Sequence, residues 1–300
     1  MTQSGLIMTA QCLALGITSD QLSDAVRQGR WTRAARGVYD TGAVTLGPKD
    51  HDKRRLRAIT LAQLAGGPDS IAIGLTALAI HGVWGVPSDL RPQVTLPHAR
   101  SVRGPGGCVV RRFKPGQVVV VDGRRAVDVP TALVQALPEV SRSTGVALLD
   151  SAINKQRITH DDLPDLARRV AGRRGSVRWK DRWSLVDGRA ESPPETWARL
   201  DCVDHGLPPD DLQVKVFRRD GRFVGRGDLG WRCGDGWVIA EIDGEEVHSE
   251  LAALFTDRRR QNSLVKIPGV TVLRYTSVDR GGVIAADVRE VLSESAHQRL

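Results

Sequence analysis

The sequence predicts an α/β protein of several domains, in an α+β arrangement: a winged helix-turn-helix, a basic α/β middle part, and a mixed sheet flanked by helices. Three observations support this. Two short helical patterns precede a β-rich segment, helix and strand patterns both occur in the middle, and the last third has the order α-β-β-β-α-β-α. The chain's 300 residues allow two or three domains, which we place at residues 1–48, 49–186 and 187–300.

The N-terminal residues are expected to form a helix-turn-helix followed by a β-hairpin wing. Residues 9–15 form the first helical pattern, and residues 18–28 begin with a Thr-x-x-Gln capping box; each pattern ends at a glycine. The β-formers of residues 31–39 predict the wing. Polar side chains along the second helix and wing could reach phosphates and base edges of DNA: Arg27, Gln28, Arg30, Arg33 and Arg36. The alternative is a helical hairpin with ordinary solvated arginines.

The middle part combines helices with short strands. A helical pattern runs from His51 to about Val86 with a break at residues 66–68, and it includes residues 71–81. His81 lies in an apolar run, so we expect a hydrogen-bonded core histidine rather than a ligand. Turn residues separate four strands, and helices follow; the expected ranges are 94–96, 108–111, 118–121 and 126–129 for strands, and 131–137, 144–154 and 161–171 for helices.

The C-terminal part is expected to begin with a helix at Glu191-Ser-Pro-Pro-Glu195. Ser192 fits the N-cap and Glu195 the third helical position, which together predict a capping box. A strand-rich segment follows. We then expect a helix over about residues 249–264, a strand over residues 270–275, and a last helix over residues 283–293.

An acidic cluster in the strand-rich segment carries most of the chemistry. The turn Cys233-Gly-Asp-Gly236 predicts a hairpin with a two-residue loop, which places Asp228 opposite Glu241. Because strand side chains alternate, Asp243 would share the face of these two residues. The alternative is an exposed hairpin whose acids face water. Glu241 and Asp243 interrupt a strand that otherwise has the pattern of a buried one, where charged residues need a reason.

Three neighbouring carboxylates repel one another and acquire raised pKa values unless a cation lies between them. Hard oxygen ligands suit Mg²⁺ or Mn²⁺, and such ions at a phosphodiester promote hydrolysis. The pattern therefore predicts a metal site at Asp228, Glu241 and Asp243.

The charge is divided unevenly along the chain. Residues 1–190 hold 28 Lys and Arg against 16 Asp and Glu, a surplus of +12, whereas residues 191–300 hold 15 against 19, giving −4. A basic front half fits a polyanionic partner. The four cysteines show no metal-binding or disulfide spacing, and neither a leader nor a long apolar run is visible, so we expect a cytoplasmic protein without membrane association.

Residues 191–285 resemble the very-short-patch-repair-like branch of the PD-(D/E)xK nuclease superfamily. The resemblance lies in an ordered set of motifs: Glu191-Ser-Pro-Pro-Glu195, Gly206-Leu-Pro208, Arg226-Gly-Asp-Leu-Gly-Trp231, Glu241-Ile-Asp-Gly244, His248, Asp257-Arg-Arg-Arg260, Leu264, Gly269 and Val272-Leu-Arg274. It implies a restriction-endonuclease-like fold. Asp228 and Glu241 would bind the metal, and Glu195 would be the acid carried by a helix.

The same resemblance places Asp243 at the position of the superfamily's lysine, where it cannot supply a positive charge. His248 is the candidate general acid or base, because imidazole titrates near neutrality. Each assignment has a plainer alternative. Glu195 would serve only as a cap, His248 would be a surface residue, and the arginines that follow Asp257 would belong to a solvated helix face.

The front of the chain resembles the AbiEi-type antitoxin family. The shared motifs are Gly5-Leu-Ile, Thr9-Ala-Gln11, Leu15-Gly-Ile17, Val26-Arg-Gln-Gly-Arg-Trp31, Arg36-Gly-Val-Tyr39 and Ala77-Leu-Ala-Ile-His-Gly82. This resemblance implies binding to operator DNA, with a nucleotidyltransferase toxin encoded nearby as a partner. The sequence thus favours a DNA-binding protein with a metal-dependent endonuclease-like domain. The alternatives are a non-enzymatic antitoxin-like repressor of a toxin-antitoxin or phage-defence operon, and a tethering partner in a defence system.

Overall fold

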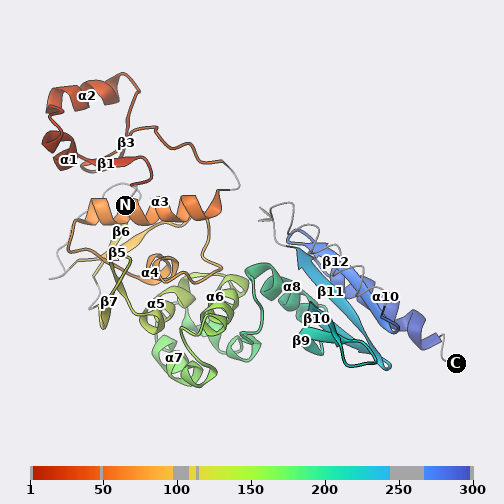
Figure 1. The fold of residues 1–300 in the computed structure, drawn as a ribbon. Helices are drawn as coiled ribbons and strands as arrows, with labels where there is room; N and C mark the ends of the chain where they lie inside the picture. The colour runs from red at the N-terminus through yellow and green to blue at the C-terminus, as the bar shows by residue number, and fades with distance from the viewer. Residues whose placement is uncertain (1–2, 48–49, 97–107, 113–114, 244–266, 298–300) are drawn as a thin grey trace. The chain divides into compact units, whose positions relative to one another are not determined.

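The computed structural model describes residues 3–47, 50–96, 108–112, 115–243 and 267–297. Its helices and sheets confirm the expected α/β class (Figure 1). Backbone contacts divide the chain into two compact units, Met1–Leu148 with Arg157–Asp181, and Leu149–Gln156 with Arg182–Leu300. The segment expected as a separate first domain belongs to the same unit as most of the middle part, and the three-domain division stays a prediction.

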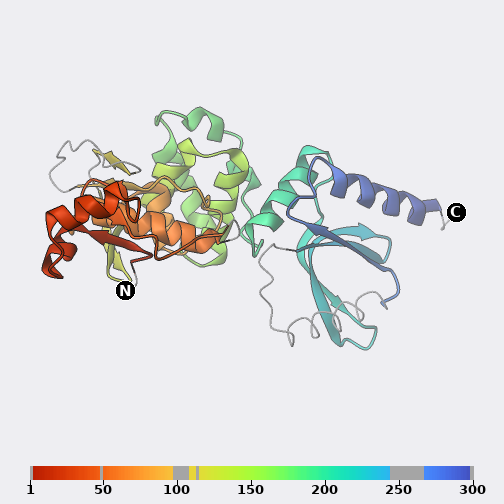
Figure 2. The same cartoon turned by 90° about the horizontal axis from the view of Figure 1, so that it is seen from above.

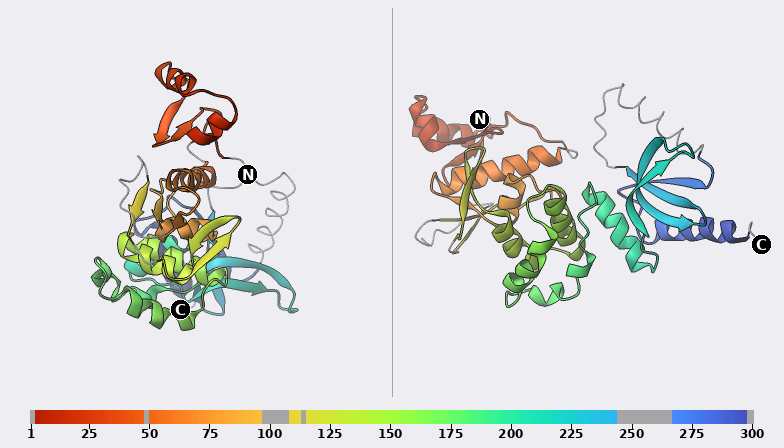
Figure 3. Two further views of the ribbon diagram at one scale, coloured as in Figure 1. Left: turned by 90° about the vertical axis from the view of Figure 1, so that its left-hand side faces the viewer. Right: turned by 60° about the horizontal axis from the view of Figure 1, so that its bottom comes forward.

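The N-terminal elements have the winged helix-turn-helix shape that the sequence predicted (red in Figure 3). Their bounds are β1 (Leu6–Met8), α1 (Thr9–Ala14), α2 (Ser19–Arg27), β2 (Thr32–Ala35) and β3 (Val38–Asp40). Thr18 caps α2: its side chain accepts from the Gln21 N–H, and Gln21 bonds back to the Thr18 N–H. The strands form a sheet in the order β1-β3-β2. The capping box and the wing are confirmed, whereas β1 was not expected.

The rest of the first unit is a five-stranded sheet with helices packed around it. The elements are α3 (His51–Gly66), β4 (Ile71–Ala72), α4 (Gly74–Ile80), β5 (Gln93–Thr95), β6 (Val109–Arg111), β7 (Val118–Val121), β8 (Arg124–Val127), α5 (Val129–Ala136), α6 (Arg142–Asn154) and α7 (Leu163–Val170). The strand order is β6-β5-β4-β8-β7. Residues 71–72 were expected to be helical, which is wrong; they form β4 because they pair with β5 and β8 in the middle of the sheet. His81 bonds the Val127 carbonyl through Nε2 at 2.8 Å, which confirms the expected hydrogen bond, although the side chain is partly exposed rather than in the core.

The second unit is a four-stranded mixed sheet with helices. Its further elements are α8 (Pro193–Asp204), β9 (Asp211–Phe217), β10 (Phe223–Cys233), β11 (Gly236–Asp243), β12 (Val270–Thr276) and α10 (Val283–His297). The strand order is β12-β11-β10-β9, with β11 and β12 parallel and the other pairs antiparallel. The predicted mixed sheet and the strand at residues 270–275 are confirmed. The helix expected at residues 249–264 lies outside the described residues.

One face of this sheet packs against α8 and α10, which lie on the same side of it (Figure 2). Residues of both helices and of all four strands form this core; examples are Cys202, Ile284, Leu212, Leu229, Ala240 and Tyr275. Val214, Val216 and Ile239 form a second, smaller core on the opposite face. Burial of both faces of the central strands explains why β11 is apolar over most of its length.

A buried ion pair fixes α8. Asp150, 1% exposed, accepts hydrogen bonds from Arg199 Nη2 at 2.9 Å and from Thr196 Oγ1 at 2.9 Å. It also accepts from the backbone N–H groups of Asp187 and Gly188. The end of α6 from Leu149 onward belongs to this second unit, and the network ties it and the segment before α8 to α8 itself. In the described part of the chain, no helix is both long and apolar enough to cross a membrane.

Candidate functional site

The β10–β11 hairpin has the register that the sequence predicted. Cys233 pairs with Gly236 across the two-residue loop, and the ladder continues to Leu229 opposite Ala240. One further step in this register brings Asp228 opposite Glu241. There the Asp228 Oδ2 accepts from the Ile242 N–H at 2.8 Å, so this carboxylate bonds across to β11 just beyond the last backbone pair.

Glu241 and Asp243 lie on the sheet face opposite α8 and α10. Their neighbours Ala240 and Ile242 belong to the core beneath these helices, and side chains alternate along the strand. Glu241 is 7% exposed, and Asp243 is half-buried. The expectation that these two acids share one face of β11 is therefore confirmed, and a buried carboxylate at Glu241 requires compensation.

Arg274 supplies positive charge to this face. In the parallel pairing of β11 with β12, Arg274 is the partner of Glu241. Its Nη2 donates to both carboxylate oxygens of Asp243 at 2.7 and 2.8 Å, and its Nε lies 3.9 Å from Glu241 Oε2. Asp243 thus stands in an ion pair, and a guanidinium from the neighbouring strand lies beside the position where the nuclease resemblance would place a lysine.

Glu195 at the start of α8 forms a different set of bonds from the predicted capping box. The Ser192 Oγ does accept from the Glu195 N–H at 3.3 Å, as an N-cap should. The Glu195 carboxylate, however, accepts from the Glu191 N–H at 2.8 Å and from Gln213 Nε2 at 2.8 Å, and not from the Ser192 backbone N–H that a capping box would use. The prediction of a reciprocal bond from the Glu195 side chain to the N-cap is wrong, because Gln213 on β9 bonds this side chain instead.

The environment of Glu195 favours its neutral form. The side chain is 7% exposed, and its pKa is raised from 4.5 to about 7, first by burial and second by the negative charge of Asp228. The hydrogen bonds from Glu191 and Ser192 only partly oppose this rise. Gln213, which bonds the Glu195 carboxylate, lies on β9 beside the part of β10 that carries Asp228, so the two acids lie in the same part of this unit.

Gln213 belongs to this cluster, although sequence reasoning missed it. The β9–β10 register places it opposite Asp228, between the pairs that Leu212 and Val214 form with β10. Its φ of 55° is left-handed, which is rare for a residue other than glycine. The consequence is a kink: Leu212 packs under the helices, whereas Val214 packs on the other face.

The amide oxygen of Gln213 is a buried acceptor that bonds to no described residue, while its Nε2 is held by Glu195. A strained backbone together with an unsatisfied buried polar atom is typical of a functional position. In the sequence, the alternating apolar residues of β9 gave no reason to single out the glutamine between them.

The donors at this face are carboxylate and amide oxygens, which are the ligand types that Mg²⁺ and Mn²⁺ prefer. In the described ranges, no group of three or more His, Cys, Asp or Glu side chains has an arrangement that could hold a metal ion as it stands. His248 and the Asp257–Arg260 motif lie outside the described residues. The chemical types therefore fit such a cation, but the described side chains do not form a closed site.

The five expected DNA-binding residues are all exposed: Arg27, Gln28, Arg30, Arg33 and Arg36. Arg27 forms an ion pair with Asp24, and Arg30 Nε donates to Gln28 Oε1 at 3.0 Å. The Arg33 guanidinium lies 5.9 Å from the ring centroid of Tyr39 on the wing. The end of α2 and the wing thus present several guanidinium groups to the solvent, although Asp24 neutralises part of this charge.

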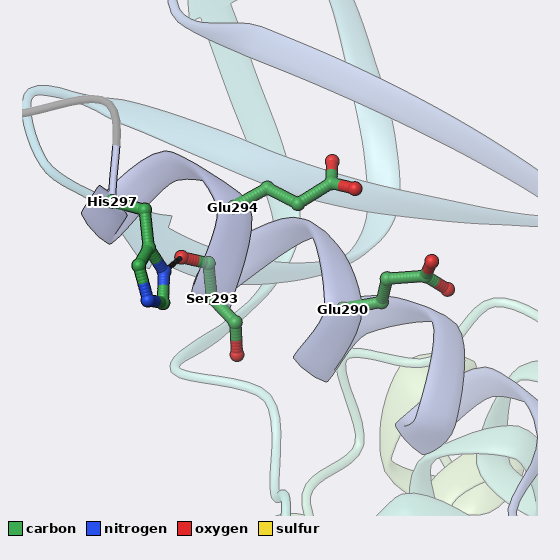
Figure 4. A pocket seen from close by; sticks show the side chains of 4 residues that line it. All are labelled: Glu290, Ser293, Glu294 and His297. Atoms are coloured by element: carbon green, nitrogen blue, oxygen red, sulfur yellow. Dashed lines mark hydrogen bonds between the residues drawn. The ribbon is translucent and has the colours of Figure 1, made fainter.

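A shallow pocket lies along α10 (Figure 4). Glu290, Ser293, Glu294 and His297 line it, and His297 Nδ1 bonds the Ser293 carbonyl oxygen at 2.7 Å. All four residues come from successive turns of one helix. The pocket is therefore a groove along a helix surface and shares no residue with the carboxylate face.

Comparison with known proteins bears on the N-terminal part. Residues 1–39 match the model of a family described as "Transcriptional regulator, AbiEi antitoxin", which covers the helix-turn-helix and most of the wing. The chain is 28% identical over 255 residues to the uncharacterized protein MT2308 of Mycobacterium tuberculosis strain CDC 1551 / Oshkosh, and to the uncharacterized protein Rv2248 of strain ATCC 25618 / H37Rv. In each case the match covers 84% of this chain and 88% of the relative. The N-terminal segment is thus similar to an AbiEi antitoxin regulator domain, which supports DNA binding.

Proposed function

We propose that this protein binds duplex DNA through its winged helix-turn-helix and carries a phosphodiester-hydrolysing site, dependent on Mg²⁺ or Mn²⁺, on its C-terminal sheet. The observation that supports the second part is the interaction of Glu195 with Asp228 beside the kink of β9 at Gln213, where burial and the charge of Asp228 raise the pKa of Glu195 to about 7; Glu241 lies opposite Asp228 in the β10–β11 register. Neighbouring carboxyl groups with a strongly raised pKa are typical of functional sites.

In this proposal Asp228 and Glu241 provide most of the ligands, and Asp243 and Glu195 complete the set. A bound cation would stabilise negative charge on the phosphodiester. Arg274 lies beside Glu241 and Asp243, so its guanidinium can hold a phosphate oxygen in place of the absent lysine. His248 remains the candidate proton carrier.

The test is a metal titration with a plasmid substrate. We expect the wild type to nick or cut the plasmid with Mg²⁺ or Mn²⁺, and we expect the double variant Asp228→Ala, Glu241→Ala to lose this activity. The matched control removes two exposed carboxylates from α10, Glu290→Ala with Glu294→Ala, and should cut like the wild type. Cleavage that survives in the Asp228, Glu241 variant contradicts the proposal, as does a wild type that cuts with neither metal.

A second candidate function is a non-enzymatic, antitoxin-like repressor. It is favoured by the match of residues 1–39 to a transcriptional-regulator family, and by the ion pair that occupies Asp243. A repressor would bind its own promoter in a sequence-specific, salt-dependent manner without a metal, and its partner would be a nucleotidyltransferase toxin encoded nearby. Promoter binding that is unchanged in the Asp228, Glu241 variant, together with absent cleavage by the wild type, would favour this function.

A further inference from the structure

The tip of the β9–β10 hairpin combines exposed aromatic rings with arginines. Every residue from 217 to 223 is exposed, and Phe217 and Phe223 are among the most exposed large apolar side chains of the described residues, at 50% and 56%. Their rings pack edge to face, with centroids 5.7 Å apart. Two phenylalanines so exposed at one point are costly in a protein that stays monomeric and unbound.

The tip is also positively charged. Arg218, Arg219 and Arg222 lie between the two rings, and Asp220 is the single acid among them. The Asp220 carboxylate accepts from the Arg222 backbone N–H at 3.0 Å, which makes it part of the turn. Across the ranges that the structure describes, no carboxylate pairs with any of these three guanidinium groups. The arginines are therefore available to an anionic partner.

The backbone holds this tip in a defined shape. Phe217 pairs with Phe223, and the Arg218 N–H donates to the Arg222 carbonyl at 2.8 Å. Gly221, with φ of 80°, adopts the left-handed conformation that the turn requires. A two-stranded β-ribbon of this kind fits into a groove of duplex DNA, and phenylalanine is one of the apolar side chains that proteins insert against base steps.

The tip is close enough to the carboxylate face for one duplex to contact both. Asp228 lies five residue steps along β10 from Phe223, which corresponds to about 17 Å of extended strand. This length spans about five base pairs of B-form DNA. Both features belong to the same compact unit, and β10 contributes to both of them.

We propose that residues 217–223 form a second DNA-binding surface, in which the arginines contact backbone phosphates of a duplex and Phe217 and Phe223 contact the bases in a groove. The positive charge of the tip favours a polyanionic partner. Phosphate groups do not require aromatic side chains, so the paired rings indicate that the partner also offers bases. This surface is separate from the winged helix-turn-helix and does not require the carboxylate site to be active.

The experiment measures binding of the full-length protein to a fluorescent duplex and to the matching single strand by anisotropy, with EDTA present so that no cleavage occurs. We compare Phe217→Ala with Phe223→Ala, the triple change of Arg218, Arg219 and Arg222 to Ala, and the same triple change to Lys. Val278→Ala, which removes an apolar side chain that is 73% exposed elsewhere in the unit, is the matched control. Circular dichroism checks that each variant is folded.

We expect the phenylalanine variant to bind the duplex about tenfold more weakly with an unchanged salt dependence, because the rings no longer touch the bases and the charge stays the same. In a plot of log affinity against log salt, the variant with three alanines should have a slope smaller in magnitude by about 0.9 for each phosphate that the tip no longer neutralises. The variant with three lysines should keep the wild-type slope. Duplex binding equal to that of the wild type in both the phenylalanine and the arginine variant would overturn the proposal. A weakening confined to the single strand would overturn the assignment to duplex DNA.

The same variants are made in a background with Arg27, Arg30 and Arg33 changed to alanine. If the winged helix does not bind DNA, the background change has no effect while the hairpin changes still weaken binding. If only the hairpin proposal fails, the background change weakens binding and the hairpin changes do not. The two failures are therefore distinguishable.

Discussion

The raised pKa of Glu195 makes the stability of the second unit depend on pH in a defined direction. A carboxyl group with a folded pKa of about 7 and an unfolded pKa near 4.5 holds its proton more tightly in the folded state. Below pH 4.5 the group is protonated in both states and costs nothing. As the pH rises towards 7, the folded state retains the proton that the unfolded state has released, so the free energy of unfolding falls. Above pH 7 the full cost is present.

The magnitude follows from the two pKa values. The difference between 4.5 and about 7 corresponds to about 3 kcal/mol, at about 1.4 kcal/mol for each pH unit. The substitution Glu195→Gln removes the charge and keeps an oxygen that can accept from Glu191 and Gln213. In EDTA the variant should match the wild type at pH 5 to within about 1 kcal/mol. At pH 8 it should be more stable than the wild type by up to about 3 kcal/mol.

Urea unfolding followed by tryptophan fluorescence and circular dichroism, from pH 5 to pH 8, measures this difference. Glu290→Gln on the exposed face of α10 is the control, and its difference from the wild type should not change with pH. If the difference between Glu195→Gln and the wild type were the same at pH 5 and pH 8, then Glu195 would titrate normally, and the inference that burial raises its pKa would be refuted.

Three further predictions concern ion pairs and exposed arginines. Arg199→Leu should lower the free energy of unfolding by about 3–5 kcal/mol because it leaves Asp150 charged and buried, and adding Asp150→Asn should restore part of this stability in urea unfolding. Arg274→Ala should strengthen Mn²⁺ binding about fivefold in calorimetry, because Asp243 and Glu241 lose a counter-ion; an unchanged affinity would place the metal elsewhere. Alanine at Arg27, Arg30 and Arg33 should lower the salt slope of DNA binding by about 2–3; a full wild-type slope would mean that the wing region does not contact phosphates.

The parts of this fold that could be predicted are those that local chemistry determines. The Gly234-Asp235 loop sets the β10–β11 register, and this register is enough to put Asp228 opposite Glu241. The Thr18 capping box is likewise an interaction between near neighbours. Residues 71–72 illustrate the limit, because a short apolar run suits a helix or a strand equally, and only pairing with distant strands decides between them.

The site itself depends on contacts that the sequence does not display. Glu195 and Gln213 are separated by a helix and a loop, and they meet because the left-handed backbone at Gln213 changes the face that β9 presents. The role of Arg274 depends on the parallel pairing of β11 with β12, across a long connection. The residue spacing was enough to identify the acids on the β10–β11 hairpin. Glu195, with its raised pKa, and Arg274, with its positive charge, lie on elements outside this hairpin.

These two charges determine how metal binding should respond to pH if the proposed site is correct. Near neutrality Glu195 holds a proton for part of the time, so a cation that uses its carboxylate must displace that proton. Mn²⁺ affinity should then rise up to about tenfold for each pH unit below 7 and level off above it, whereas the Glu195→Gln variant should bind with little dependence on pH. Calorimetry in buffers of different ionisation enthalpy counts the released protons directly. A wild-type affinity that is constant from pH 5.5 to 8, with no proton released, would mean that Glu195 is not a ligand and that it contributes to this face only as a buried, hydrogen-bonded acid.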